Sequence, residues 1–330
     1  MIRKIAIFFL LIIVSTGLGA AGAGDKFPVE PKFAVEPRFD SAMSFSEGLA
    51  AVKVNGKMGY IDHNGKIVIE PAYDLAWRFS GGLAPVNSGG IWGFIDKSGK
   101  YRIKPAFGWA LSFTEGLAAV NIGGLGVGHW GYIDREGRVV IEPRFDVAWP
   151  FSEGAARVEI DGKNLYIDRA GNILKDKRRF TDGVAPVLLK GKWGYIKRDG
   201  KIAVEPRFDT AFPFNDGIAA VVVGGRWGFI EKSGDYILKP GFADIDFANS
   251  FSEGLSRVGV DDDGKMADYT DDLAIDRWGY VDKAGRLIID IRYERAYDFS
   301  EGVAAVMVDG KWGYIENPLT ENTLTGGVKK

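Results

Sequence analysis

The sequence predicts an all-β fold made of a tandem array of about eight three-stranded antiparallel meanders. One segment, residues 299–316, recurs in related copies from Phe45 onward. The phenylalanines that open the copies are separated by 34, 34, 38, 29, 34, 37 and 48 residues, so the basic period is 34. Most copies also contain two turn signals between strand-like runs. Such a period is typical of arrays in which every unit packs on its neighbours.

The first turn signal predicts a hairpin in each copy. In residues 299–316, only Asp309-Gly310 separates the apolar run Val303–Val308 from the aromatic run Lys311–Glu316. Asp-Gly in this position favours a type I′ turn, because both central residues of that turn need a positive φ. We therefore expect two antiparallel strands joined by a two-residue turn.

The second turn signal predicts a third strand. The aromatic run is followed by an acid-x-x-Gly pattern, as at residues 62–65, which fits a type I turn that ends in a left-handed glycine. A short strand is then expected over residues 66–69. A proline follows in most copies, as at Pro71, and its missing N–H is expected to end that strand.

The middle strand indicates how the copies stack. Strand alternation places Trp312 and Tyr314 on one face and Gly313 on the other. We interpret this glycine as the seat for an aromatic ring of the neighbouring copy, such as Phe299, because strand glycines mark close approach. A lone meander is too small to be stable, so the copies must pack together. For Trp193, a platform for carbohydrate stacking is the alternative to a structural role. The tryptophans expected in the structural core of the repeats are Trp92, Trp130, Trp193, Trp227, Trp278 and Trp312.

These motifs resemble the WG-repeat family, also called the KWG repeat. The resemblance rests on Lys-Trp-Gly-Tyr-Ile at residues 192–196 and 311–315 and on Arg-Trp-Gly-Phe-Ile at residues 226–230. Glu-Pro-Arg-Phe-Asp at residues 142–146 and 205–209 supports it, and the similarity extends over about residues 27–316. The resemblance implies an all-β tandem array used for binding, with no enzymatic activity common to the family.

The two ends of the array raise the question of closure. Residues 29–33 and 35–39 match the third strand of a unit, whereas the last copy lacks this strand because Asn317-Pro318 follows Glu316. Residues 35–39 could supply it and close an eight-bladed, propeller-like ring. We nevertheless favour an open, curved or superhelical array, since the number of copies varies widely in the family. A separation above about 10 Å between Val35 and Tyr314 would exclude the closed ring.

The N-terminal segment predicts export. Residues 1–23 contain Arg3 and Lys4, an apolar run at residues 5–14 and the small residues Ala21-Gly22-Ala23, as in a secretory signal peptide. An uncleaved anchor is the alternative, because the apolar stretch approaches the length of a membrane span. We expect a signal peptide at 1–23, a WG-repeat domain at 24–316 and a polar tail at 317–330. The protein would be periplasmic or extracellular, without membrane insertion after cleavage.

Composition argues against several functions. Removal of Arg3 and Lys4 with the signal changes the formal net charge from −2 to −4, so the chain lacks the basic surface that nucleic acids require. There is no cysteine, and the two histidines, His63 and His129, fall in different turns. This leaves little material for a metal site or a Ser-His-Asp triad, and we expect neither a metal nor a cofactor.

Carboxylates keep one catalytic alternative open. Paired acids can hydrolyse glycosidic bonds, and acidic residues such as Glu47, Glu115 and Glu301 are plentiful. They recur at the same turn in nearly every copy, which is typical of structural residues. We therefore favour a non-catalytic binding or interaction scaffold whose ligand is a protein or a glycan. The alternative is a secreted hydrolase that acts on glycans through carboxylates.

Departures from the period are the candidate binding sites. An insertion at residues 261–276 is rich in aspartate and could bind Ca²⁺, although the expected ligand positions at its ends fall on Gly259 and Thr270. A disordered acidic loop is the alternative. In the fourth copy, Asn164-Leu165 replaces Trp-Gly, and a basic run follows at residues 175–179. This run could bind an anionic partner, or it could only prevent pairing of an exposed sheet edge with another strand. The candidate binding residues are Asp261, Asp262, Asp263, Asp268, Asp271, Asp272, Lys175, Lys177, Arg178 and Arg179.

Overall fold

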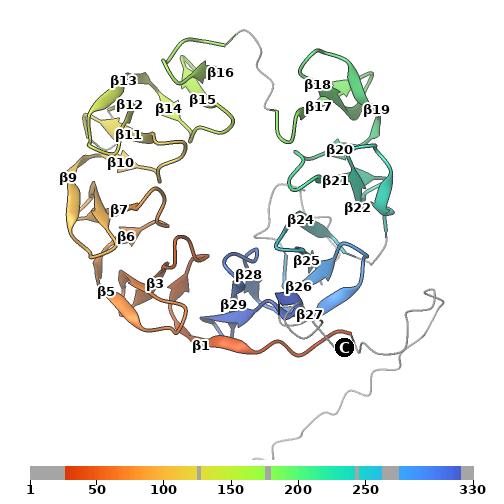
Figure 1. Cartoon of the computed structure of the whole chain (residues 1–330), viewed down its shortest axis with the longest axis horizontal. Helices are drawn as coiled ribbons and strands as arrows, with labels where there is room; N and C mark the ends of the chain where they lie inside the picture. The colour runs from red at the N-terminus through yellow and green to blue at the C-terminus, as the bar shows by residue number, and fades with distance from the viewer. Residues whose placement is uncertain (1–26, 125–127, 175–179, 242–244, 262–274, 321–330) are drawn as a thin grey trace, which may run out of the picture.

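The computed structural model describes residues 27–124, 128–174, 180–241, 245–261 and 275–320. These residues form eight small antiparallel sheets around a ring, an eight-bladed β-propeller (Figure 1). The all-β prediction is therefore confirmed. One helical turn, residues 318–320, follows the last strand, and no helix in the described ranges has the length and apolarity needed to cross a membrane. The expected signal peptide lies outside the described residues.

Each blade runs from the centre of the ring to its rim, and we number the blades along the chain from the one that begins at β2. Most blades open with a two-residue inner strand that the sequence prediction missed, so six of the sheets have four strands. The fourth blade (β14–β16) and the fifth blade (β17–β19) have three. The inner strands are β2 (Ser41–Ala42), β6 (Leu75–Ala76), β10 (Trp109–Ala110), β14 (Val147–Ala148), β20 (Thr210–Ala211), β24 (Phe247–Ser252) and β28 (Arg295–Ala296).

The second and third strands of each blade form the predicted hairpin. The second strands are β3 (Ala50–Val54), β7 (Leu83–Ser88), β11 (Ala118–Ile122), β15 (Ala155–Ile160), β17 (Val184–Leu189), β21 (Ile218–Val223), β25 (Leu255–Val260) and β29 (Val303–Val308). The third strands are β4 (Lys57–Ile61), β8 (Ile91–Asp96), β12 (His129–Ile133), β16 (Lys163–Asp168), β18 (Lys192–Lys197), β22 (Arg226–Glu231), β26 (Arg277–Asp282) and β30 (Lys311–Glu316).

The outer strands form the rim of the ring (Figure 1). They are β1 (Phe33–Phe39), β5 (Ile67–Tyr73), β9 (Tyr101–Phe107), β13 (Val139–Phe145), β19 (Ile202–Phe208), β23 (Tyr236–Leu238) and β27 (Leu287–Tyr293).

Both predicted turns are confirmed. Val308 pairs with Lys311 across the two-residue turn, where Asp309 and Gly310 have φ values of 50° and 70°. These left-handed conformations are those that a type I′ turn needs. At the second turn, the N–H of Gly65 donates to the carbonyl of Asp62 at 2.9 Å.

The outer strand corrects two expectations. It does not end at its proline, because β5 continues through Pro71 to Tyr73. The register jumps from Tyr60↔Ile69 to Met58↔Tyr73, so the proline lies in a bulge, where its missing N–H costs no ladder bond. Nor does the glycine after the tryptophan seat a neighbouring aromatic ring. A Cβ on Gly59 would lie 2.6 Å from the carbonyl O of Ile69 and 2.8 Å from the N of Pro71, so it makes room for the bulged strand of its own blade.

The ring is closed, and the expected open array is wrong. Strand β1 pairs antiparallel with β30, and Val35 and Tyr314 are register partners. The N-terminal strand thus supplies the outer strand that the eighth blade (β28–β30) lacks. A Cβ on Gly313 would lie 2.6 Å from the N of Pro37, the same close approach as within the first blade. Closure prevails because the two chain ends satisfy each other's backbone hydrogen bonds and leave no terminal edge.

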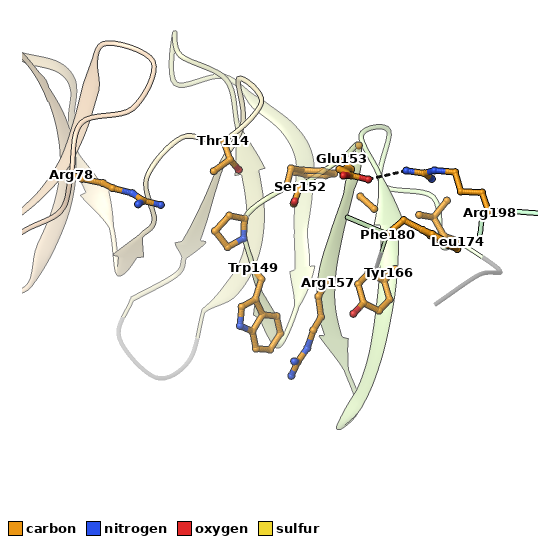
Figure 2. Close-up of a pocket in the computed structure, with 14 residues that line it drawn as sticks. Arg78, Thr114, Trp149, Ser152, Glu153, Arg157, Tyr166, Leu174, Phe180 and Arg198 are labelled. Carbon is orange, nitrogen blue, oxygen red and sulfur yellow. Dashed lines mark hydrogen bonds and ion pairs between the residues drawn. The ribbon is translucent and has the colours of Figure 1, made fainter. Parts of the chain in front are cut away.

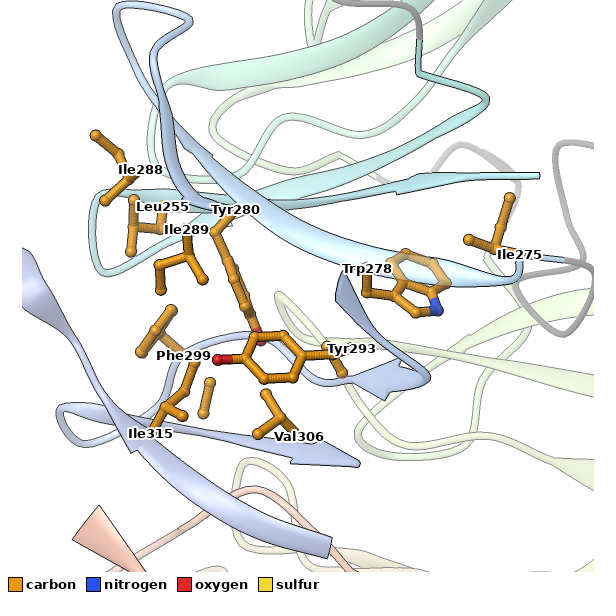
Figure 3. Close-up of a cluster of buried hydrophobic side chains, with 12 residues drawn as sticks. Leu255, Ile275, Trp278, Tyr280, Ile288, Ile289, Tyr293, Phe299, Val306 and Ile315 are labelled. Atoms are coloured by element: carbon orange, nitrogen blue, oxygen red, sulfur yellow. The ribbon is translucent and has the colours of Figure 1, made fainter. Parts of the chain in front are cut away.

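Blades are joined by one repeated set of contacts. The ring of Tyr280 packs on Phe299 of the next blade, with 4.8 Å between the ring centroids (Figure 3). Its hydroxyl donates to the carbonyl of Tyr297 at 2.6 Å. Across the closing junction, Tyr314 packs on Phe45 at 4.9 Å and donates to the carbonyl of Met43 at 2.7 Å. The junction between the chain ends is therefore built like the others. The repeated phenylalanine packs on a tyrosine of the preceding blade at these junctions, and on a phenylalanine at two others, Phe94–Phe113 and Phe229–Phe251.

Candidate functional site

A cavity of about 790 Å³ lies where the seam between the fourth and fifth blades meets the centre of the ring (Figure 2). We call it the seam cavity. Its walls combine aromatic rings, three guanidinium groups and one carboxylate. The charged and aromatic side chains in these walls include Arg78, Trp149, Glu153, Arg157, Tyr166, Phe180 and Arg198.

Within the described ranges, the outer segment of the fourth blade at this seam is short. It consists of a bridge between Ile167 and Ile173 and one hydrogen bond from the N–H of Leu174 to the carbonyl of Tyr166. In complete blades the tyrosine at this position is fully buried, as Tyr60 is. Tyr166 is only half-buried, and its ring lines the cavity. A surface that every complete blade covers is thus accessible here.

Arg157 is the unusual residue of this blade. Its register partner is Tyr166, and the equivalent position in the first blade is Ala51, which pairs with Tyr60. The Arg157 guanidinium lies 4.1 Å from the ring centroid of Trp149, and its Nε donates to Oδ1 of Asn164 at 2.9 Å. Asn164 stands where other copies have tryptophan. The asparagine that replaces the tryptophan therefore also holds the Arg157 side chain in place by this hydrogen bond.

A second arginine, Arg257, occupies the equivalent position of another blade, where it has a carboxylate partner. In the seventh blade (β24–β27), Arg257 lies over Trp278 at 4.2 Å and is buried. Its Nη1 donates to the carbonyl of Ala296 at 2.7 Å, and its Nε lies 3.5 Å from a carboxylate oxygen of Asp298. Arg257 is therefore neutralised inside the fold. Arg157 is exposed, and no carboxylate within the described ranges forms an ion pair with it.

The seam cavity carries an excess of positive charge. Arg198 is engaged by Glu153 at 2.9 Å and lies over the ring of Phe180 at 5.0 Å. Arg78 enters from the second blade (β6–β9), on the side of the cavity away from Arg198 (Figure 2). Like Arg157, Arg78 has no carboxylate partner among the residues described. Two uncompensated guanidinium groups therefore favour an anionic ligand.

A smaller hollow of about 500 Å³ adjoins the seam cavity, and the two share Arg78, Thr114 and Pro150. Most of its walls come from the two residues that precede the phenylalanine in the first, second, third and eighth blades, among them Trp77 and Tyr297. Large apolar or aromatic residues take the first of these positions in six blades. These residues are Met43, Trp77, Leu111, Trp149, Phe212 and Tyr297.

Seven segments of the chain match the family model of WG-containing repeats, at residues 30–57, 58–90, 92–125, 130–163, 193–227, 227–262 and 278–312. The chain belongs to this family. The stretch between residues 163 and 193 is outside the matches, and it contains Tyr166 and Phe180 of the seam cavity. One wall of the cavity therefore lies where this WG-repeat propeller departs from its own repeat, whereas Trp149, Arg157 and Arg198 lie within matched segments.

The fold is also similar to several solved structures. A eukaryotic initiation factor superimposes with a TM-score of 0.47 at 12% identity, over 79% of this chain and 90% of that one. The extracellular domain of a hybrid two-component system from B. thetaiotaomicron superimposes with a TM-score of 0.39 at 9% identity. The match covers 88% of this chain and 40% of that one. PorZ, a surface component of the type IX secretion system of Porphyromonas gingivalis, superimposes with a TM-score of 0.39 at 13% identity. The match covers 88% of this chain and 46% of that one. The WG-repeat chain thus spans less than half of the latter two. No curated protein matches the sequence.

The predicted core tryptophans of the WG-repeat propeller differ in burial. Trp92, Trp227 and Trp278 are about 1% exposed and Trp312 is 8% exposed, whereas Trp130 and Trp193 are only half-buried. The buried ones are covered by an aromatic ring: Trp77 stacks on Trp92 at 6.0 Å, Phe212 on Trp227 at 5.1 Å and Tyr297 on Trp312 at 5.2 Å. Trp278 is instead covered by Phe247 and Arg257.

Most of the predicted binding residues cannot be placed. Asp261 is described, and its N–H donates to Oδ2 of Asp246 at 2.9 Å. The ranges that are described contain no group of three or more histidine or acidic residues arranged to hold a metal. The other candidates, Asp262, Asp263, Asp268, Asp271, Asp272, Lys175, Lys177, Arg178 and Arg179, lie outside the described residues.

The residues of the seam cavity were missed by sequence reasoning, although a signal for them exists. The replacement of Trp-Gly by Asn164-Leu165 marked the correct copy of the repeat. Alignment of the copies also places Arg157 in a column otherwise occupied mainly by alanine, such as Ala51 and Ala119. The column also holds Arg257, so the available indication of a site was an arginine in this column within the copy that has lost Trp-Gly.

Proposed function

We propose that this WG-repeat propeller is a non-catalytic binding scaffold of the cell envelope or the extracellular space, and that it takes its ligand in the seam cavity. The observation that carries the proposal is a cavity lined by two guanidinium groups, those of Arg78 and Arg157, which have no carboxylate partner among the described residues. Its volume is in the range typical of ligand pockets, roughly 300–1,000 Å³. The location outside the cytoplasm rests on the signal-like pattern of residues 1–23.

The carboxylates near the cavity favour binding over hydrolysis. A glycoside hydrolase needs two acids flanking the scissile bond, at about 5–5.5 Å or about 6.5–9.5 Å from each other. Glu153 is the carboxylate that lines the seam cavity, and it is engaged by Arg198. Asp298, in the adjoining hollow, accepts a hydrogen bond from Nδ2 of Asn249 at 2.8 Å and faces Arg257. Each acid thus has a structural partner.

The repeated polar residues are occupied by the fold itself. Oε2 of Glu47 accepts the N–H of Gly82 in the next blade at 2.9 Å. Nζ of Lys57 pairs with Oδ1 of Asp74 at 2.5 Å. Groups that recur with the period therefore serve the joints of the ring, and the non-repeating seam is the better candidate for recognition.

The proposal is tested by capture of glycans and proteins from envelope extract on immobilised protein. Trp149→Ala is expected to abolish recovery of the ligand. Trp193→Ala is the matched control, because Trp193 is also half-buried but does not line the cavity. Equal recovery by Trp149→Ala and the unchanged protein would refute the seam as the binding site. Turnover of a captured glycan would refute the non-catalytic assignment.

A further inference from the structure

The guanidinium of Arg157 is held ready for a planar oxyanion. It is stacked on Trp149, and its Nε is engaged by Asn164, so neither η nitrogen is bonded to a residue of the described ranges. Two parallel N–H groups of an arginine match the two oxygens of a carboxylate. Because the side chain is already fixed, little conformational entropy is lost when a carboxylate binds.

The aromatic lining selects what carries the carboxylate. Trp149 and Tyr166 are half-buried, and Tyr166 lies opposite Arg157 in the strand register. Aromatic rings of this kind offer flat apolar surfaces beside polar groups. A sugar ring has a matching apolar face of C–H groups, whereas the flexible side chain of an acidic peptide has none. The combination fits a carboxylate borne on a ring.

From these observations we infer that the seam cavity binds a uronate residue of an acidic glycan. The carboxylate pairs with the η nitrogens of Arg157, and the sugar ring lies against Tyr166. Arg78 adds a second positive charge from the second blade (Figure 2). The inference rests on the proposed function, since it assigns a ligand class to the same cavity.

The test is a titration of protein carrying ¹⁵N-labelled tryptophan, with the indole signal of Trp149 assigned by Trp149→Phe. The probes are an oligogalacturonate, a neutral oligogalactose of the same length, benzoate and a glutamate-rich peptide. The oligogalacturonate is expected to shift the Trp149 signal and to bind at least about tenfold more tightly than each of the other three, because charge-assisted hydrogen bonds and ring stacking act together only there.

Two variants of Arg157 test whether binding needs the paired N–H donors of the guanidinium or only its positive charge. Arg157→Gln and Arg157→Lys are both expected to weaken oligogalacturonate binding by about tenfold or more, because lysine keeps the charge but not the paired donors. Arg169→Gln is the control: Arg169 is exposed, faces Glu115 at 3.8 Å and does not line the cavity. Circular dichroism and thermal midpoints verify that each variant is folded. Full affinity in Arg157→Lys would overturn the bidentate arrangement.

The probes also separate failure of the inference from failure of the proposed function. Equal affinity for oligogalactose would overturn recognition of the carboxylate. Benzoate or the peptide binding as tightly as oligogalacturonate would overturn the glycan as its carrier. If oligogalacturonate leaves the Trp149 signal unchanged while the ligand captured from envelope extract shifts it, the uronate inference fails and the proposed function stands. If neither shifts it, both fail.

Discussion

Substitution of Gly313 by alanine is expected to weaken the closure of the ring. The added Cβ would lie 2.6 Å from the backbone N of Pro37 and 2.7 Å from the carbonyl O of Val35. Both atoms belong to β1, which reaches β30 only through the rest of the ring. No side-chain rotation relieves a contact with backbone atoms, so β1 must move away from β30.

The cost is set by overpacking, which typically destabilises a protein by about 1–3 kcal/mol. Displacement of β1 also disturbs the register pairs of β30 with Val35 and Phe39. Domains of about 150–250 residues lose about 2–4 °C of thermal midpoint for each kcal/mol. The expected decrease in the midpoint of Gly313→Ala is therefore roughly 2–12 °C.

Thermal denaturation and hydrogen exchange of residues 33–39 measure the effect. Gly59→Ala is the matched control, because its Cβ would lie 2.6 Å from the carbonyl O of Ile69 but β5 is tethered to β4 by a short turn. Both variants should lose stability, and only Gly313→Ala should accelerate exchange in residues 33–39. A wild-type midpoint and unchanged exchange in Gly313→Ala would show that this close approach does not hold the ring shut.

Three further outcomes are expected. Tyr314→Phe removes the hydroxyl that donates a hydrogen bond to Met43 across the closing junction. Denaturant titration should then show an unfolding free energy that is lower by about 0.5–1.5 kcal/mol. An unchanged unfolding free energy would mean that water replaces this bond. The hydrogen bond from Lys311 lowers the pKa of Asp40 in the folded protein. The pair therefore stabilises the fold at pH values above the pKa that Asp40 has in the unfolded chain, about 3.9. This stabilisation is lost as the pH falls through the lower pKa of the folded state. Asp40→Asn should therefore flatten the decline of thermal midpoint between about pH 5 and 2.5, and identical slopes would refute the contribution. Trp227→Ala should cost about 3–5 kcal/mol and Trp193→Ala less, because Trp193 is only half-buried; equal losses would contradict this ranking.

Short-range features of this protein could be predicted from its sequence. The hairpin at Asp309-Gly310 and the acid-x-x-Gly turn at residues 62–65 depend on local backbone sterics, which two to four residues specify. The matching of residues 35–39 to a third strand also pointed to the ring that forms. The glycine of the middle strand was recognised as a close approach, but its partner was assigned wrongly. Gly59 faces Pro71, and only the bulge in β5 brings that proline over it.

Tertiary structure decided the closure of the ring and the position of the cavity. Whether a ring closes depends on small rotations between neighbouring blades, which accumulate over the whole array and are not written in any one copy of the repeat. The seam cavity combines Tyr166, beside which the described residues form only a short outer segment, with an arginine from the distant second blade, Arg78. Periodicity describes what each copy contains, so it cannot show which surface becomes accessible when one copy is incomplete. That requires the neighbouring blades in place, because burial is a property of the packed array.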